Sequence, residues 1–179
     1  ARGGNVEEDH RRASFEALLK NPTGGNAGLM PDAAAHPAAP GFRPLKVTQV
    51  VQESVDVVSL AMQSADDQPL PAAMPGQYVV LRLQRTADGP PLFRSYSLSG
   101  HPSTGSYRIS VKIEPNGAAG TFLKEHVGVD GILHVSSPRG SFILQSGERP
   151  VVLLSAGIGA TPVLAMLHAL AVARSTRQV

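Results

Sequence analysis

From Leu45 onward, short runs of alternating apolar and polar residues predict β-strands. Successive side chains of a strand point to opposite faces, so a period of two indicates a strand with one buried face. Turn-forming residues separate the runs, as at Asp66-Asp67 and Met74-Pro75-Gly76. Six runs spaced in this way predict an antiparallel barrel or sandwich. The predicted strands cover Lys46–Val51, Val55–Met62, Tyr78–Leu83, Phe93–Leu98, Tyr107–Ile113 and Ile132–Val135.

The pattern changes after Gly147. Val151–Leu154 is a continuous apolar run, typical of a parallel strand that is buried on both faces. A Gly-rich turn follows, and Pro162–Arg174 then predicts a helix with an apolar stripe. We interpret residues 148–179 as the first βα unit of an α/β domain, which we expect to be truncated because one strand and one helix cannot form a stable layer. Within the barrel region one short helix is predicted, over Thr121–Val127.

The first 42 residues have a different composition from the rest. Ser14–Lys20 predicts a short helix, and residues 21–44 are dominated by Pro, Gly, Ala and Asn, as in a linker. We interpret residues 1–42 as a helix and linker that form the tail of an upstream domain. A disordered N-terminal arm is the alternative.

Composition excludes several classes of function. A formal net charge of +2 without a basic run argues against nucleic acid as a partner. The sequence has no cysteine, and its six histidines show no metal-like spacing, so we expect no metal site. No apolar stretch approaches the roughly 20 residues that span a bilayer, and the first residues do not resemble a signal peptide. A cytoplasmic protein without membrane association is therefore expected.

The predicted strand Phe93–Leu98 carries the first candidate site. Alternation places Arg94 and Tyr96 on one face and Ser95 and Ser97 on the other. An arginine can grip a phosphate with two parallel hydrogen bonds, and an aromatic ring two residues away can lie against a flat heteroaromatic ring. Ser97 points away from Tyr96, but its backbone N–H could contact the same ring.

Three further segments are candidates. Tyr78 could form a wall of the same site, or be an ordinary strand tyrosine. Gly117–Thr121 precedes the predicted helix, where free N–H groups bind anions, although a simple loop and N-cap would have the same sequence. Gly157–Pro162 follows the predicted strand Val151–Leu154, with Thr161 as N-cap and Pro162 as the first helical residue. Such a turn fits a nucleotide site or a structural connection equally well.

Taken together, these segments resemble a known family. Residues 43–179 are similar to the flavin-binding barrel, and to the start of the nicotinamide-nucleotide domain, of the ferredoxin–NADP⁺ reductase superfamily. The similarity is strongest to its flavohaemoglobin-like branch and to bacterial oxidoreductases fused to a MOSC domain. The motifs occur in the family's order: Pro75-Gly76-Gln77-Tyr78, Arg94-Ser95-Tyr96-Ser97-Leu98-Ser99, Ile109-Ser110-Val111-Lys112 and Gly157-Ile158-Gly159-Ala160-Thr161-Pro162.

The resemblance implies a six-stranded, antiparallel, Greek-key-like barrel that binds FAD. It implies that Arg94 contacts the pyrophosphate, that Tyr96 stacks on the isoalloxazine, and that Ser97 lies near its reactive nitrogen. Further implied flavin contacts are Tyr78, Ser95, Val111, Lys112, Gly120 and Thr121. The implied nicotinamide pocket consists of Gly157, Ile158, Gly159, Ala160, Thr161 and Pro162. The resemblance also implies that the residues nearest the reacting flavin and nicotinamide rings are Tyr96, Ser97 and Thr161.

The implied activity is hydride transfer from NAD(P)H to the flavin, followed by electron transfer to an iron–sulfur or haem partner. The alternatives are the reductase part of a globin-type nitric oxide dioxygenase, or a flavin-binding fragment without turnover. The segment from His10 to Leu19 resembles the tail that follows a MOSC domain. The later strands of the nucleotide domain are absent from this sequence, so we expect the chain to be inactive alone.

Overall fold

The structure is a computed structural model that describes residues 41–101 and 105–179. All of these residues belong to one compact unit. The predicted helix Ser14–Lys20 lies outside the described residues, and so does most of the predicted linker. In the described ranges no helix is long and apolar enough to cross a membrane.

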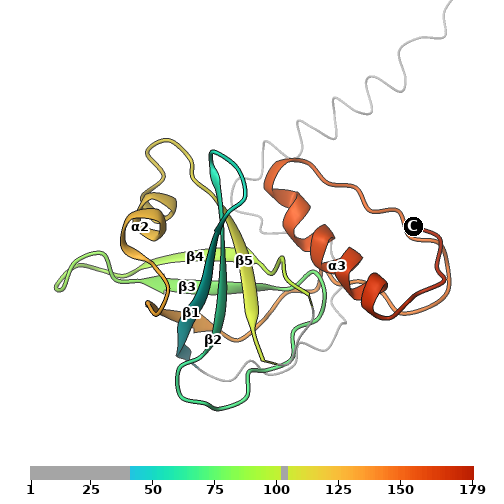
Figure 1. The fold of residues 1–179 in the computed structure, drawn as a ribbon, viewed down its shortest axis with the longest axis horizontal. Helices are drawn as coiled ribbons and strands as arrows, with labels where there is room; N and C mark the ends of the chain where they lie inside the picture. The colour runs from blue at the N-terminus through green and yellow to red at the C-terminus, as the bar shows by residue number, and fades with distance from the viewer. Residues whose placement is uncertain (1–40, 102–104) are drawn as a thin grey trace, which may run out of the picture. The chain divides into compact units, whose positions relative to one another are not determined.

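Six antiparallel strands form a single curled sheet (Figure 1). Their order in the sheet is β4-β3-β6-β1-β2-β5, so β6 is inserted between β3 and β1. The edge strands β4 and β5 meet at one isolated bridge, between Leu98 and Ile109, which makes the barrel nearly closed. All six predicted strands are confirmed, with ends shifted by a few residues. They are β1 (Phe42–Gln52), β2 (Val57–Ser64), β3 (Tyr78–Leu83), β4 (Leu92–Ser97), β5 (Tyr107–Lys112) and β6 (Ile132–Ser136).

Alternate residues of these strands form the core. On β3, for example, Val79, Leu81 and Leu83 are at most 1% exposed, whereas Arg82 between them is exposed. The same alternation on the other strands buries apolar side chains inside the barrel. Other members of this core are Leu45, Val47, Leu60, Met62, Ile109, Val111, Leu133 and Val135.

Helix α2 (Ala118–His126) starts three residues before the predicted Thr121. The turn before it explains the early start, because the N–H of Gly117 donates to the carbonyl of Glu114. Asn116 has a φ of +63° in this turn, as the third residue of a type II turn requires. The N–H of Thr121 then donates to the carbonyl of Gly117, which is the first helical bond.

The C-terminal part contains a 3-10 turn, η1 (Gly157–Gly159), and helix α3 (Ala160–Val172). The predicted strand Val151–Leu154 does not form, and Val152 and Leu154 are 80% and 85% exposed. A parallel strand buried on both faces needs neighbouring strands and covering helices. The described residues supply only one backbone bond here, from the N–H of Val151 to the carbonyl of Gln178. The predicted helix is therefore present as α3 and the predicted strand is absent, whereas the assignment of residues 148–179 to a nucleotide-binding domain stays a prediction.

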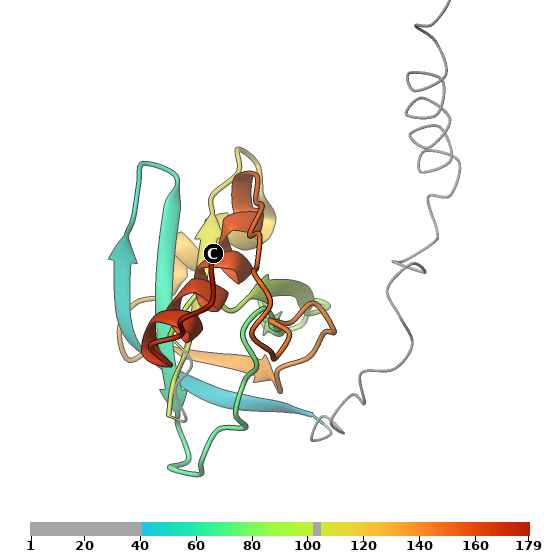
Figure 2. The same ribbon diagram turned by 90° about the vertical axis from the view of Figure 1, so that its right-hand side faces the viewer.

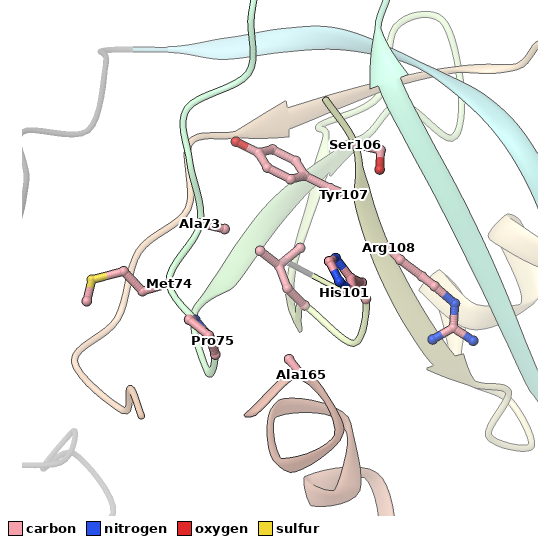
Figure 3. Close-up of a pocket in the computed structure, with 10 residues that line it drawn as sticks. Ala73, Met74, Pro75, His101, Ser106, Tyr107, Arg108 and Ala165 are labelled. Atoms are coloured by element: carbon pink, nitrogen blue, oxygen red, sulfur yellow. The ribbon is translucent and has the colours of Figure 1, made fainter. Parts of the chain in front are cut away.

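Helix α3 packs against one end of the barrel (Figure 2). Gly76 lies close to this helix, since a Cβ atom added there would be 2.6 Å from the terminal carbon of Met166; the same Cβ would be 2.2 Å from the backbone carbonyl oxygen of Phe142, so the position requires glycine. Figure 3 shows Ala165 of α3 facing Pro75 and His101, which line a small pocket. The ring centroids of His101 and His168 are 6.5 Å apart. The contacts of α3 with the barrel therefore involve residues in the middle of the helix.

Candidate functional site

The edges of β4 and β5 define a seam in the barrel wall. The bridge between Leu98 and Ile109 fixes the antiparallel register. Counting back along β4 and forward along β5 from that bridge puts Tyr96 level with Val111, and Arg94 level with Ile113. No further pairing joins the described parts of β4 and β5 along this stretch. The seam therefore widens from the bridge toward α2, with unpaired backbone on both sides.

Backbone groups of Ser95, Ser97 and Lys112 face this seam. The N–H of Leu98 donates to the carbonyl of Gln77, just before β3, whereas that of Ser99 donates across to the carbonyl of Arg108 on β5. Alternation then directs the N–H groups of Ser95 and Ser97 toward the seam, because adjacent residues of a strand bond to opposite neighbours. On β5 the N–H of Ile113 donates to Asp56, so that of Lys112 also faces the seam. Ser97 can thus contact a ligand through its backbone.

Arg94 and Tyr96 lie on the predicted common face of β4. They pair with Leu81 and Val79 of β3, whose side chains enter the core. Nη1 of Arg94 donates to the carbonyl oxygen of Phe93 at 2.8 Å, and no ion pair among the described residues involves Arg94. Burial raises the pKa of Tyr96, and the nearby Arg94 guanidinium opposes this shift. A neutral phenol therefore lies beside an arginine that forms no ion pair within the part of the chain that the structure describes.

Tyr78 lies on the other face of the same strand pair. It is directly opposite Ser97, and its backbone forms both bonds of a bridge with Arg139. A Cβ atom added at Gly140 would be 2.9 Å from two carbons of the Tyr78 ring, so the ring packs against a glycine with a φ of +106°. The structure therefore brings Tyr78 next to Ser97, but not onto the face that carries Tyr96.

The start of α2 has no side-chain cap. The N–H groups of Ala118, Ala119 and Gly120 precede the first helical bond, so they have no acceptor within the helix. A Cβ atom at Gly120 would lie 3.4 Å from Cα of Ile113 and from the carbonyl oxygen of Lys112, which places the helix start against β5. Because the Thr121 N–H is already bonded, Thr121 can offer a ligand only its hydroxyl.

Two residues of β5 were expected to contact a flavin. The Val111 side chain is 2% exposed in the core, opposite Val58 of β2. Nζ of Lys112 lies 2.9 Å from Oε1 of Glu114, and this hydrogen bond raises the lysine pKa. Any contact from Lys112 to a ligand at the seam would therefore come from its backbone.

The Gly157–Pro162 turn is formed, but Thr161 is not its N-cap. Gly159 is the N-cap residue, and the Thr161 hydroxyl donates to the carbonyl of Ile158 at 2.8 Å. The prediction placed the helix start two residues late. A Cβ atom added at Gly157 or Gly159 would meet nothing within 4 Å, so the turn is open there. The described contacts join α3 to the barrel through Ala165, Met166 and His168 instead.

The nearly closed six-stranded barrel matches the fold of FAD-binding domains of the ferredoxin-reductase type. Phthalate dioxygenase reductase, a modular structure for electron transfer from pyridine nucleotides to [2Fe-2S], aligns with a TM-score of 0.67 at 28% identity, covering 77% of this chain and 42% of that one. Residues 44–143, more than half of the chain, match the oxidoreductase FAD-binding domain family. The chain belongs to this family, whose cofactor is FAD.

Flavohemoproteins are among its relatives. The flavohemoprotein of Deinococcus radiodurans is 44% identical over 138 residues, which are 77% of this chain and 34% of that protein. The FAD/NAD-binding domain of nitric oxide dioxygenase from Vibrio cholerae has a TM-score of 0.72 at 35% identity, covering 76% of this chain and 60% of that one. The chain thus spans about a third of the length of the curated relatives that it matches.

Two groups of residues were missed by the sequence reading. Ser59, Ser99 and Ser110 form a buried chain of hydroxyls, with Ser110 Oγ 2.8 Å from each of the other two. Ser59 lies on β2, Ser110 on β5 and Ser99 just after β4, so only the fold brings them together. The second group lines a groove between α2 and the β3–β4 loop. The spacing of Phe122 and His126, four residues apart on a helix, is a signal that could have indicated it.

Proposed function

We propose that this chain is the FAD-binding module of an NAD(P)H-dependent oxidoreductase that passes electrons to a haem or iron–sulfur acceptor. The observation that carries the proposal is the seam, where Arg94 has no acidic partner among the described residues and lies level with the uncapped start of α2. An exposed guanidinium and free helix N–H groups together suit a pyrophosphate. The flavin, when bound, supplies the chemistry that accepts a hydride and releases single electrons.

The chain's own residues would bind and orient this cofactor. Arg94, Gly120 and the Thr121 hydroxyl would hold the pyrophosphate, and the Tyr96 ring would lie against the isoalloxazine. Seam-facing N–H groups of Ser95, Ser97 and Lys112 would bond its polar edge, with Ser97 near the reactive nitrogen. Tyr78 would contact it from the Ser97 side, whereas Val111 would support the strand from the core. The nicotinamide would enter beside Gly157–Pro162, where Thr161 holds the turn in shape.

Substitution of Arg94 tests the flavin site. Arg94→Ala should weaken FAD binding about 10-fold to 100-fold, because a hydrogen bond to a charged group contributes roughly 1.5–3 kcal/mol. The affinity is measured by titrating the apoprotein with FAD and following flavin fluorescence. Arg82→Ala is the matched control, since Arg82 is an exposed arginine on the neighbouring strand with its ring contact to Phe42. Equal FAD affinity in the Arg94→Ala variant and the control would contradict the assignment.

Anaerobic addition of NADH and of NADPH to the FAD-loaded chain separates the enzymatic alternatives. Loss of the visible flavin absorbance would show hydride transfer, and the faster nucleotide would be the preferred donor. A bound flavin that neither nucleotide reduces would support the alternative of a flavin-binding fragment without turnover.

The identity of the acceptor defines a second candidate function. Flavohemoprotein relatives favour the reductase part of a globin-type nitric oxide dioxygenase. The similarity of His10–Leu19 to the tail of a MOSC domain favours a MOSC fusion instead. A cytoplasmic location is part of both versions. Sequencing the gene upstream of Ala1 would distinguish them, because a globin and a MOSC domain share no fold.

A further inference from the structure

The narrow end of the seam is held by Arg108, a residue of β5 that has no role in the flavin site described above. Its Nη1 atom donates to Oγ of Ser99 at 3.0 Å and to the carbonyl oxygen of the same residue at 3.3 Å. In return, the N–H of Ser99 donates to the carbonyl of Arg108 at 2.8 Å. Figure 3 shows the Arg108 side chain directed away from that of Tyr107, which enters the core. Arg108 therefore grips the segment after β4 with both its backbone and its side chain.

Glu53 fixes the guanidinium in this position. Its Oε1 atom accepts a hydrogen bond from Nη2 of Arg108, so the two terminal nitrogens have different partners. Glu53 follows β1, and its own N–H donates to the carbonyl of Val57 at 2.9 Å. The backbone of Gly100 lies against the arginine stem, because a Cβ atom added there would be 2.8 Å from Cβ of Arg108. We call Arg108, Ser99 and Glu53 the clamp.

The clamp continues inward as a directed chain of buried hydroxyls. A guanidinium can only donate, so it occupies a lone pair of Ser99 Oγ and leaves the hydrogen of that hydroxyl free. Of the two acceptors for this hydrogen, Oγ of Ser110 is the closer, at 2.8 Å, and the carbonyl of Arg108 is 3.5 Å away. Ser110 then donates to Ser59, also at 2.8 Å. The bond from the cation thus anchors a polar network in the barrel wall.

The clamp lies where the seam begins. Among the described residues, β4 and β5 share a single bridge, between Leu98 and Ile109, so no ladder of backbone bonds sets their separation. Ser99 follows this bridge and is fully buried, whereas Ser97 precedes it and has its N–H toward the seam. Fixing Ser99 therefore also fixes the distance of the Ser97 backbone from β5. A functional donor must be held to within about 0.5 Å, and side-chain bonds to its neighbours supply that precision.

We propose that Arg108 is a positioning residue, which holds the Ser97 N–H at the place where it bonds the reactive nitrogen of the flavin. This inference rests on the proposed function. In oxidised flavin that nitrogen is a hydrogen-bond acceptor, whereas in reduced flavin it carries a hydrogen. A well-placed N–H therefore favours the oxidised form. Arg108 would lower the reduction potential of the bound flavin in this way, acting through Ser99 and Ser97 without touching the flavin.

The test measures two dissociation constants on the full chain, one for oxidised FAD and one for FAD reduced anaerobically with dithionite. Arg108→Ala should change the ratio of the two constants about threefold to tenfold, with the oxidised form weakened more, because one neutral hydrogen bond is lost. The reduction potential of the bound flavin should then rise by about 14–30 mV, since a tenfold change is about 30 mV for two electrons. Lys46→Ala is the matched control, because it breaks an exposed ion pair with Asp130 elsewhere on the barrel.

Two substitutions of Glu53 test the clamp without touching a buried group. Glu53→Ala releases the guanidinium, so it should change the ratio in the same direction by a smaller factor. Glu53→Gln keeps an acceptor oxygen for Nη2 of Arg108, and it should restore most of the original ratio. These variants decide the question even where Arg108→Ala unfolds the barrel, because an unchanged ratio in Glu53→Ala would then count against the positioning role.

The outcomes separate this inference from the proposed function. If Arg108→Ala weakens both forms of FAD equally, the ratio stays the same and the role of Arg108 is structural only, while the flavin site stands. A selective loss that also occurs in Lys46→Ala would overturn the positioning role too, because it would be a general effect of charge. If the original chain binds neither form of FAD, the proposed function itself fails.

Discussion

The barrel and the C-terminal segment of this chain bury their apolar residues to very different degrees. Val79, Leu81 and Ile109 of the barrel are fully buried between paired strands, whereas Val152 and Leu154 are 80% and 85% exposed. Both regions are rich in β-branched and aliphatic residues. The difference teaches that such a run becomes a strand only where hydrogen-bonding partners and covering side chains are both present.

The largest effects should come from a pair of substitutions that test this difference directly. Leu81→Ala should lower the free energy of unfolding by about 2–5 kcal/mol, because it leaves a cavity in a packed core. Leu154→Ala should change it by no more than about 0.5 kcal/mol, since that side chain is already in solvent. Urea unfolding followed by circular dichroism measures both. Comparable losses of unfolding free energy in the two variants would mean that Leu154 is buried in solution. The difference in burial between the barrel and the C-terminal segment would then be contradicted.

An intermediate effect is expected at the serine chain, which joins β2, β5 and the segment that follows β4. Ser110→Ala should cost about 1–3 kcal/mol, because Ser59 loses the partner of a buried hydroxyl. Adding Ser59→Ala to this variant removes the unpaired hydroxyl, so the double variant should lose less than the sum of the two single variants. Strictly additive losses in urea unfolding would show that the hydroxyls do not act as one network.

The smallest effect is expected at the barrel surface, where pH is the variable. Hydrogen bonds from Ser64 and Arg43 lower the pKa of Asp66 from 3.8 to about 2. A folded-state pKa below the unfolded value stabilises the protein above pH 3.8, and this contribution is lost as the pH falls to about 2. Unfolding should therefore depend less steeply on pH between 4 and 2 in Asp66→Asn than in the original chain. If the stability of both proteins changed identically with pH, the Arg43–Asp66 pair would contribute nothing to the pH dependence of unfolding.

Most of the barrel was predictable because its information is local. Alternation along Tyr78–Leu83 fixes which side chains of that strand are buried. In the same way, alternation along β4 puts Arg94 and Ser97 on opposite faces. The start of α2 was less predictable, since the turn at Asn116 allows the helix to begin before Thr121. The strand prediction for Val151–Leu154 was wrong for a non-local reason, because its partners would have to come from other segments.

The candidate site was predictable only in part. Arg94, Tyr96 and the helix start follow from short motifs, and the register of β4 and β5 brings them to one seam. The groove beside Arg85 was not predicted, because a loop residue and a helix residue become neighbours only through the curvature of the sheet. The sequence also could not show that the Thr121 N–H and the Thr161 hydroxyl are already bonded within the protein.

The widening of the seam beyond Leu98 and Ile109 has a consequence for how the chain behaves among its own copies. Unpaired strand edges are templates on which another molecule can add a strand, and such edges promote association. A cofactor bound along the seam would cover these edges, and it would favour the folded state by mass action. Loading with FAD would then raise the solubility and the storage stability of the protein as well as its activity. The chain without FAD would be the species prone to self-association.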